Sequence, residues 1–271
     1  MARYPRQDDK GGKNVIPSVT EIISDCTDGT PWAIPYGANQ ACDWIIGECE
    51  WDTLESQDEG YYKVTDEDLR KRLKGEKDYP NNARYAHKHH SQKALDIGSE
   101  VHNAIEVYLK REIARKDDGE PHWDITDPIY AKLSRQAMNA FNAFNAWQKE
   151  HNLKPIALEQ TVYSHDGLWA GTLDLNCWLN EKRYIIDFKT SGAFYPEHRY
   201  QVAAYRIAVE DETLHEEDFP QGCGVLRLDK ETGLPEWKDT SKSYKQDLRI
   251  FNRMVDLYFE RHPIIRKRAR G

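Results

Sequence analysis

The sequence predicts an α/β fold, in which a central mixed sheet of about four or five strands is flanked by helices. Residues 172–179 and 182–190 alternate apolar and polar side chains around a short polar turn, which is typical of two antiparallel, half-buried strands. Residues 95–115 and 129–147 instead repeat apolar side chains at intervals of three or four, which is typical of helices that pack on a sheet. We therefore expect helices and strands to share one core.

The remaining elements follow in chain order. Residues 1–14 are polar and are expected to form a flexible tail. Residues 15–94 are expected to form a mainly helical elaboration, considered as a cap over a cleft. The core is expected at 95–262, followed by a basic tail at 263–271. Within the core we expect a strand at 156–162, a helix at 196–210, a strand at 224–228, a turn at 229–233 and a closing helix around 248–258.

The two predicted strands have a register that can be deduced from their turn. A turn at Asn180 and Glu181 places Asp174 opposite Asp187, and Thr172 opposite Lys189. Asp187 and Lys189 share a face, because side chains two apart on a strand point the same way. The other face of the pair is expected to be apolar and to pack in the core; it comprises Leu173, Leu175, Cys177, Leu179, Tyr184, Ile186 and Phe188.

Two opposed carboxylates about 5 Å apart would repel each other by about 3 kcal/mol at an effective dielectric near 20. A cation between Asp174 and Asp187 would offset this repulsion. Lys189 supplies one charge, and carboxylate oxygens are also the ligands that Mg²⁺ and Mn²⁺ prefer. An ordinary solvated sheet face with an Asp–Lys ion pair fits the same pattern, and the strands alone leave both interpretations open.

Polar residues upstream and downstream extend this pattern. On the helix at 95–115, Gly98 and His102 lie beside the apolar stripe, and the glycine suggests a close approach there because it costs about 1 kcal/mol relative to alanine. His102 taken alone also fits a packed or exposed bystander. Glu159 lies in the strand at 156–162, and Gln201 and Tyr205 lie one turn apart on the next helix.

Taken in order, these residues resemble the motif series of the RecB-type branch of the PD-(D/E)XK nuclease superfamily. The resemblance covers residues 95 to about 228. The opening Ile16-Pro17-Ser18-Val19-Thr20 is similar to the start of phage and mitochondrial-genome-maintenance exonucleases of this branch. The motifs that carry it are Gly98-Ser-Glu-Val-His102, Glu159, Gly171-Thr-Leu-Asp174, Asp187-Phe-Lys189-Thr-Ser191 and Gln201-Val-Ala-Ala-Tyr205.

The resemblance implies a PD-(D/E)XK nuclease core and a role for each motif residue. His102, Asp174, Asp187 and the main-chain carbonyl of Phe188 would hold the catalytic metal, one or two ions of Mg²⁺ or Mn²⁺. Glu159 would hold a second metal or its waters. Lys189 would orient and help deprotonate the attacking water or stabilise the pentacovalent phosphate. Gln201 and Tyr205 would position Lys189 or the scissile phosphate, and Thr190 and Ser191 are expected at the nucleic acid.

The cysteines argue against an iron–sulfur cluster, which some members of the branch hold with one cysteine before the core and three after it. Here only Cys223 follows the Gln–Tyr helix, so no cluster is expected. Five cysteines without regular spacing fit a reducing compartment, and we expect a cytoplasmic protein. Neither a membrane-spanning run nor a signal peptide is expected from the sequence.

The net charge of −8 is unusual for a DNA-binding protein, so its distribution matters. Acidic residues concentrate in 48–59 and 210–218. Residues 69–93 are basic and are a candidate surface for the phosphate backbone, although a solvated helix face fits them equally. The candidate DNA-binding residues there are Arg70, Lys71, Arg72, Lys74, Arg84 and Lys88.

The resemblance, together with the residues that carry it, implies a metal-dependent deoxyribonuclease. An exonuclease acting on the ends of linear DNA in replication or recombination is favoured, with a preference for single strands and with a single-strand-binding or annealing protein as a candidate partner. An endonuclease of the same fold is an alternative, as is a catalytically idle DNA-binding protein. The oligomeric state is not predicted. No GxxxxGK[ST] loop occurs, so we expect no helicase activity in this chain.

Overall fold

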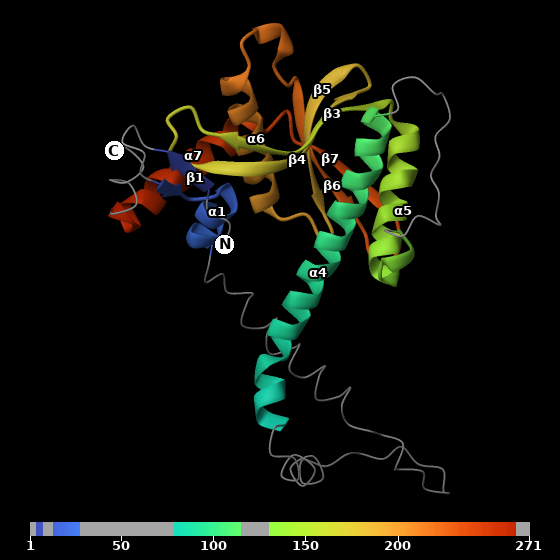
Figure 1. The fold of residues 1–271 in the computed structure, drawn as a ribbon. Helices are drawn as coiled ribbons and strands as arrows, with labels where there is room; N and C mark the ends of the chain where they lie inside the picture. The colour runs from blue at the N-terminus through green and yellow to red at the C-terminus, as the bar shows by residue number, and fades with distance from the viewer. Residues whose placement is uncertain (1–3, 8–12, 28–78, 115–129, 264–271) are drawn as a thin grey trace, which may run out of the picture. The chain divides into compact units, whose positions relative to one another are not determined.

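The computed structural model describes residues 4–7, 13–27, 79–114 and 130–263 (Figure 1). Residues 1–28 and 97–271 form one compact unit, and residues 29–96 form another. The predicted helical elaboration at 15–94 lies mostly outside the described residues. Its first described element, α1 (Val19–Thr27), belongs to the unit that contains the sheet, because Val19, Ile22 and Ile23 are buried in its core.

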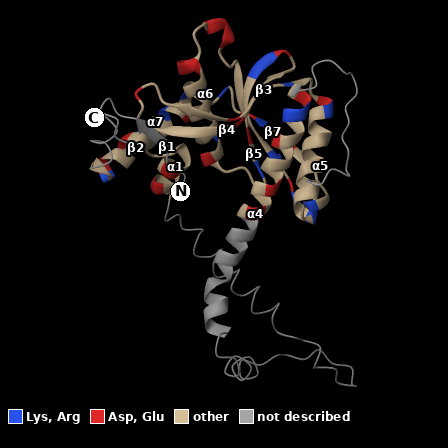
Figure 2. Cartoon of the chain, viewed as in Figure 1, with Lys and Arg blue, Asp and Glu red and all other residues tan. Residues whose placement is uncertain are grey.

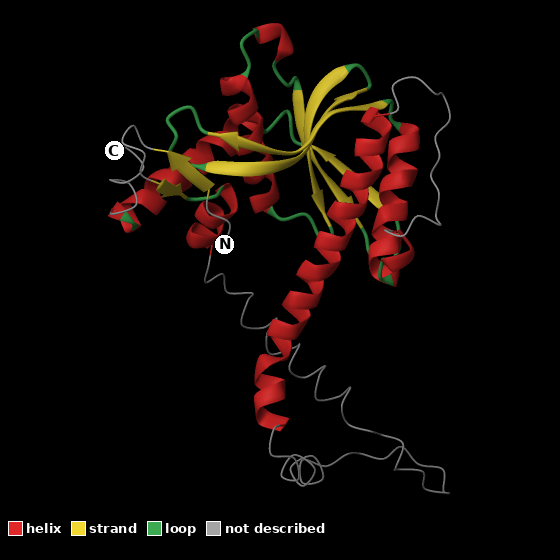
Figure 3. Ribbon diagram, in the orientation of Figure 1, coloured by secondary structure: helices red, strands yellow, loops and turns green. Residues whose placement is uncertain are grey.

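A five-stranded mixed sheet forms the centre of the larger unit, as predicted (Figure 3). The strands lie side by side in chain order, and only β5 and β6 run parallel. Their connection contains helix α6, as expected for a parallel crossover. The strands are β3 (Leu153–Tyr163), β4 (Ala170–Leu179), β5 (Lys182–Lys189), β6 (Gly222–Leu228) and β7 (Pro235–Asp239).

Helices cover both faces of this sheet, and each layer has its own apolar core (Figures 1 and 3). Helices α4 (Tyr79–Ala114) and α5 (Arg135–Glu150) bury residues such as Val101 and Phe144 with Leu175 and Ile186 of the sheet. On the opposite face, α1, α6 (Pro196–Glu212) and α7 (Tyr244–Arg261) pack against Ile185 and Val225. The sheet is therefore sandwiched, which fixes side chains on both of its faces.

Several elements differ from the sequence prediction. The helix expected through 129–147 begins only at Arg135, after a short 3₁₀ helix η2 (Tyr130–Lys132), because the Ser134 hydroxyl accepts a hydrogen bond from Ala137 N at 3.3 Å and caps the helix. Strand β7 was not predicted. Within the segment expected as a flexible tail, β1 (Tyr4–Gln7) pairs antiparallel with β2 (Lys13–Ile16).

The β4–β5 hairpin has the predicted register, in which Leu175 pairs with Ile186 and Leu179 with Lys182. Asn180 and Glu181 both have positive φ, as a two-residue type I′ turn requires. The pairing ends at Leu175 and Ile186, so the predicted pairings of Asp174 with Asp187 and of Thr172 with Lys189 do not form; Thr172 pairs with Thr161 of β3 instead.

The predicted apolar face is correct for Leu175, Cys177, Leu179, Ile186 and Phe188, which are buried beneath α4 and α5. It is wrong for Leu173, which is buried in the core on the α6 side. Between Leu175 and Leu173 the β3–β4 ladder omits the pair of Glu159 with Asp174, and Glu159 has a φ of 47°, so the regular alternation is interrupted at this point.

Gly171 allows the ring of Tyr205 to lie directly against β4. A Cβ atom at this position would lie 2.4 Å from Cε1 of Tyr205 and 3.2 Å from Cγ2 of Val19. The glycine at Gly98 is different, because a Cβ atom there would meet the Thr190 hydroxyl at 3.4 Å, an ordinary contact distance. The close approach expected at Gly98 is therefore mild, and the tight one is at Gly171.

We predict that Gly171→Ala lowers the free energy of unfolding by about 1–3 kcal/mol, because the new methyl group overlaps the buried Tyr205 ring. Gly98→Ala is the control and should be neutral or stabilising by up to about 1 kcal/mol, since it improves helix propensity without a clash. Urea unfolding of both variants measures the difference. Equal stabilities would contradict the steric role of Gly171.

Candidate active site

Charged residues from three elements meet where β4 and β5 separate. Asp174 lies on β4, Asp187 and Lys189 lie near the end of β5, and His102 lies on α4. Asp174 and Asp187 are buried, although each carries a carboxylate. Burying two such groups is costly unless each is paired or hydrogen-bonded, so their surroundings define the site.

Asp174 is held by both neighbouring layers. Its Oδ2 accepts a hydrogen bond from the backbone N–H of Phe188 at 2.6 Å, and its Oδ1 lies 3.4 Å from Nδ1 of His102. Burial raises the pKa of this carboxyl, but His102, Lys189 and the Phe188 N–H together hold the pKa below its usual value. Asp174 is therefore an anion that links β4 to β5 and to α4.

Asp187 and Lys189 form a buried ion pair on one face of β5. The Lys189 Nζ lies 2.6 Å from Oδ2 of Asp187, whose residue is only 1% exposed. Burial raises the pKa of Asp187, whereas Asp187 and Asp174 outweigh burial at Lys189 and raise its pKa. Lys189 is thus held as an ammonium ion in the metal-free protein.

The other carboxylate oxygen of Asp187, Oδ1, is buried and has no hydrogen-bond partner among the described residues. A buried anionic oxygen without a donor is unfavourable, since its desolvation is not offset. A cation bound at this oxygen would remove the penalty.

Glu159 joins His102 and Asp174 in a group of ligand atoms that lie within 4.8 Å of one another. Burial, followed by the charge of Asp174, raises the pKa of Glu159 to about 7. Burial lowers the pKa of His102, but Asp174 outweighs it and raises the pKa to about 9. Glu159 was assigned to a second metal or its waters by the resemblance; in the structure its carboxylate lies in one group with two of the proposed first-metal ligands.

The backbone of Glu159 is in the left-handed region, with φ of 47°, although the residue lies within β3. Its neighbours Leu158 and Gln160 pair with Leu175 and Leu173, so the departure is local and falls beside Asp174. A left-handed conformation costs a residue with a Cβ atom about 1–2 kcal/mol. Strain of this kind is found where a side chain is held for function.

The donors fit a hard divalent cation. Carboxylate oxygens and one imidazole nitrogen suit Mg²⁺ or Mn²⁺, and the unsatisfied Oδ1 of Asp187 supplies a further anionic ligand beside the His102–Glu159–Asp174 group. The Phe188 carbonyl as a ligand stays a prediction. The Phe188 ring helps to hold the His102 ring in place, because it contacts His102 edge-on with ring centroids 6.0 Å apart and packs against Phe144.

Gln201 and Tyr205 lie one turn apart on α6, as predicted. The Gln201 side-chain amide donates to the Tyr205 hydroxyl at 2.8 Å, and the Tyr205 ring is buried. Their roles toward Lys189 or a phosphate stay predictions. Their side chains do support each other, which orients the Gln201 amide.

His198 lies one turn before Gln201 and was missed from the sequence. Burial, followed by the charges of Lys189 and Lys238, lowers its pKa to about 4, so the imidazole is neutral. Its Nδ1 accepts a hydrogen bond from the Tyr195 N–H at 3.4 Å at the start of α6. The three-residue spacing to Gln201 is the signal that places both on one helical face.

The candidate DNA-binding residues fall into two groups. Thr190 and Ser191 follow Lys189 directly; the Thr190 hydroxyl faces Gly98 of α4, and the Ser191 hydroxyl donates to Ala193 O at 2.8 Å. The basic residues of the candidate phosphate surface lie outside the described side chains, either in 28–78 or in the first part of α4; they are Arg70, Lys71, Arg72, Lys74, Arg84 and Lys88.

The acidic stretch at 210–218 lies at the far end of α6 from its site residues. It continues into the 3₁₀ helix η3 (Glu216–Asp218), all three residues of which are acidic (Figure 2). The start of α6, in contrast, lies beside Lys189, as the effect of Lys189 on His198 shows. This group of acidic residues is thus kept away from the candidate site.

Comparison with known proteins agrees with this geometry. A family model described as "PD-(D/E)XK nuclease superfamily" matches residues 72–262, which is most of the chain. A search of curated proteins gave no match. Among the described residues, no helix combines the length and apolar character needed to cross a membrane.

The strain at Glu159 can be measured apart from its charge. Glu159→Gly and Glu159→Ala both remove the carboxylate, but only glycine adopts positive φ without a steric cost. In EDTA we expect the glycine variant to be about 1 kcal/mol more stable than the alanine variant. Denaturant unfolding tests this; a more stable alanine variant would show that the backbone is not strained.

Metal binding should depend steeply on pH. In the metal-free protein the pKa of His102 is about 9, that of Glu159 about 7 and that of Asp187 about 6, so an ion must displace one proton between pH 7 and 9 and a second between pH 6 and 7. We predict that affinity for Mn²⁺ rises with pH, by about tenfold per unit between pH 7 and 8.5. Calorimetry in buffers of different ionisation enthalpy counts the protons released. A pH-independent affinity would contradict this ligand set.

Proposed function

Because the chain belongs to the PD-(D/E)XK nuclease superfamily, we propose that it is an Mg²⁺- or Mn²⁺-dependent deoxyribonuclease that degrades linear DNA from its ends. The observation that carries this proposal is the buried Asp187–Lys189 pair beside the His102–Glu159–Asp174 group. Metal ligands and an ammonium group within one small volume are what hydrolysis of a phosphodiester requires.

Each residue has a proposed role. His102, Glu159, Asp174 and Asp187 would hold the ion, which when bound lowers the pKa of water and offsets charge that develops on the phosphate. Lys189 donates hydrogen bonds as an ammonium ion, because the two aspartates keep it protonated. This charge state favours its role in orienting the water and stabilising the pentacovalent phosphate. Deprotonation of the water by Lys189 would first require loss of its own proton.

Residues of α6 would bind the scissile phosphate from the other side. The Gln201 amide is oriented by Tyr205, and neutral His198 can donate a hydrogen bond without adding charge. Thr190 and Ser191 would contact the DNA strand as it passes the end of β5. Together these groups would hold the phosphodiester beside Lys189 and the proposed metal ligands, in an orientation that would let water attack in line with the leaving oxygen.

The preference for ends is supported by the resemblance of the motif series, and of residues 16–20, to exonucleases of the RecB-type branch. In the structure this opening leads into α1, which packs against β4 beside Gly171. A role in replication or recombination, with a single-strand-binding or annealing protein as partner, follows from the same resemblance.

The experiment compares linear single- and double-stranded DNA, labelled at either end, with a closed circle. We expect degradation of linear DNA with Mg²⁺ or Mn²⁺, survival of circles, and no cleavage in EDTA. Lys189→Ala should lower kcat by about 10²–10⁴-fold, because it removes the charge beside the phosphate. Lys182→Ala, at the exposed start of the same strand, is the matched control and should retain activity.

Other outcomes would assign the chain differently. Cut circles would indicate an endonuclease of the same fold. DNA binding without cleavage under any metal condition would indicate a catalytically idle binding protein. Full activity of the Lys189→Ala protein would contradict the proposed role of Lys189.

A further inference from the structure

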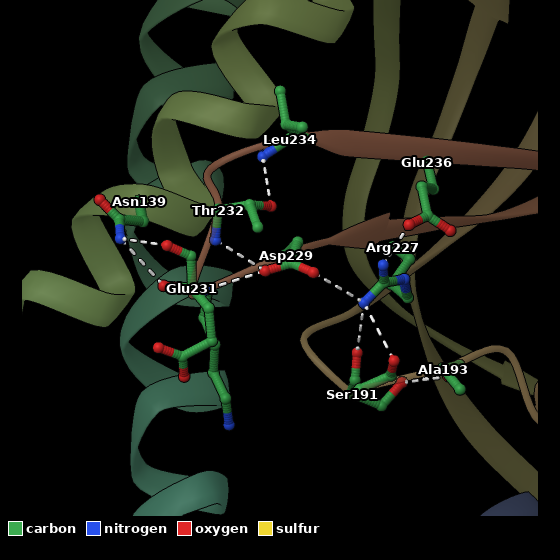
Figure 4. Close-up of polar contacts among 11 residues, drawn as sticks. Asn139, Ser191, Ala193, Arg227, Asp229, Glu231, Thr232, Leu234 and Glu236 are labelled. Carbon is green, nitrogen blue, oxygen red and sulfur yellow. Dashed lines mark hydrogen bonds and ion pairs between the residues drawn. The ribbon is translucent and has the colours of Figure 1, made fainter.

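The loop that leaves the candidate site is held by a buried arginine on the neighbouring strand. Arg227 pairs with Lys189 in the parallel β5–β6 ladder and is 7% exposed. Its Nη1 donates to the carbonyl oxygens of Ser191 at 3.1 Å and Gly192 at 3.3 Å (Figure 4). These two carbonyls belong to the segment 190–195, which connects the end of β5 to the start of α6.

The middle of this loop has little packing of its own, whereas Phe194 near its end packs against the core beneath α6 and lies under the Lys238 ammonium group. Gly192 and Ala193 are exposed, and no atom lies within 4 Å of the position that a Cβ of Gly192 would occupy, among the residues described. The hydrogen bond described for the Ser191 hydroxyl is also within the loop, to Ala193 O. Among the contacts described, the hydrogen bonds from Arg227 are therefore those that tie the backbone of Ser191 and Gly192 to the sheet.

Arg227 is in turn anchored at its other side. Its guanidinium also binds Oδ2 of Asp229 at 3.1 Å and the carboxylate of Glu236 on β7. Asp229 is fixed by hydrogen bonds from the N–H groups of Glu231 and Thr232, and the Asn139 side chain of α5 donates to the carbonyls of residues 230 and 231 (Figure 4). Arg227 therefore connects the loop 190–195 to the turn at 229–233, which is itself held by Asn139 of helix α5.

The chemistry of this position requires an arginine. In the structure Nη1 lies within hydrogen-bond distance of two carbonyls and Asp229, and Nη2 contacts Glu236, whereas a lysine ammonium offers three donors from a single nitrogen. The carboxylates of Asp229 and Glu236 offset the buried positive charge of Arg227. Asp187 forms its ion pair with Lys189 instead.

We propose that Arg227 is a positioning residue for the nuclease reaction. By holding the carbonyls of Ser191 and Gly192, it fixes the course of the chain directly after Lys189 and sets where α6 begins, with His198 and Gln201. The side-chain contacts described for Arg227 are with Ser191, Gly192, Asp229 and Glu236, and none of these is a proposed metal ligand. This inference rests on the proposed function for its kinetic consequence, while its structural consequence can be measured independently.

The test compares Arg227→Met with a matched control, Arg206→Met. Arg206 is also a partly buried arginine, paired with Glu210 at 2.7 Å and stacked over Tyr244 at 4.0 Å, and it has no contact with the loop in the described structure. We expect both variants to lose stability. Only Arg227→Met should increase hydrogen exchange across 190–195 and lower kcat by about 10–100-fold, measured well below both melting temperatures. Its affinity for Mn²⁺ should stay within about twofold of wild type.

Glu236→Gln removes one carboxylate but keeps the guanidinium, so it should retain wild-type loop exchange and kcat. The proposal is overturned if Arg227→Met leaves loop exchange and kcat unchanged, or if Arg206→Met lowers kcat equally. If Arg227→Met does not fold, Arg227→Lys replaces it, and wild-type behaviour of that variant would overturn the proposal. If the wild-type protein does not cleave DNA, the proposed function is wrong. Hydrogen exchange across 190–195 would still show whether Arg227 holds the loop.

Discussion

The hydrogen bond from the Phe188 N–H to the Asp174 carboxylate is the contact on which the rest of the site depends. It replaces backbone pairing at the point where β4 leaves β5, and it helps to keep Asp174 ionised in a buried position. Once this charge is buried, His102 and Lys189 are needed close by to offset it. Without these partners, two carboxylates in this volume would repel each other and would take up protons.

The two apolar cores provide the rigid frame for these charges. The core beneath α4 and α5 fixes His102, because Val101 and Ile105 on either side of its turn are fully buried. The core beneath α6 fixes Gln201 through Tyr205, whose ring fits only because residue 171 has no side chain. The charged residues thus lie at the junction of two cores, and each helix delivers its functional residue from a separate face of the sheet.

Electrostatics also explains how an acidic chain can serve as a DNA-cleaving enzyme. The buried aspartates attract cations to the site, and Lys189 and Arg227 are both fixed near the end of β5 and β6. Acidic residues at 210–218 lie at the opposite end of α6. Local charge, rather than the net value of −8, therefore decides what the site can bind.

The sequence by itself determined the main elements of the sheet and the register of the β4–β5 hairpin. Alternation of apolar side chains and a two-residue turn are local properties, and a slip by one residue would have turned the apolar side chains of the strand to the wrong face. The same local reasoning placed His102, Asp174, Asp187 and Lys189 on the elements where the structure has them.

Only the tertiary structure decided the finer geometry. Leu173 turns to the α6 side, Glu159 adopts positive φ, and Arg227 and His198 join the surroundings of Lys189. None of these features has a local signal strong enough to predict it, because each results from contacts between elements distant in sequence. A side chain that bonds a backbone N–H on the next strand, or a guanidinium that holds a loop, depends on where the packed layers bring the chain, and periodicity carries no information about that.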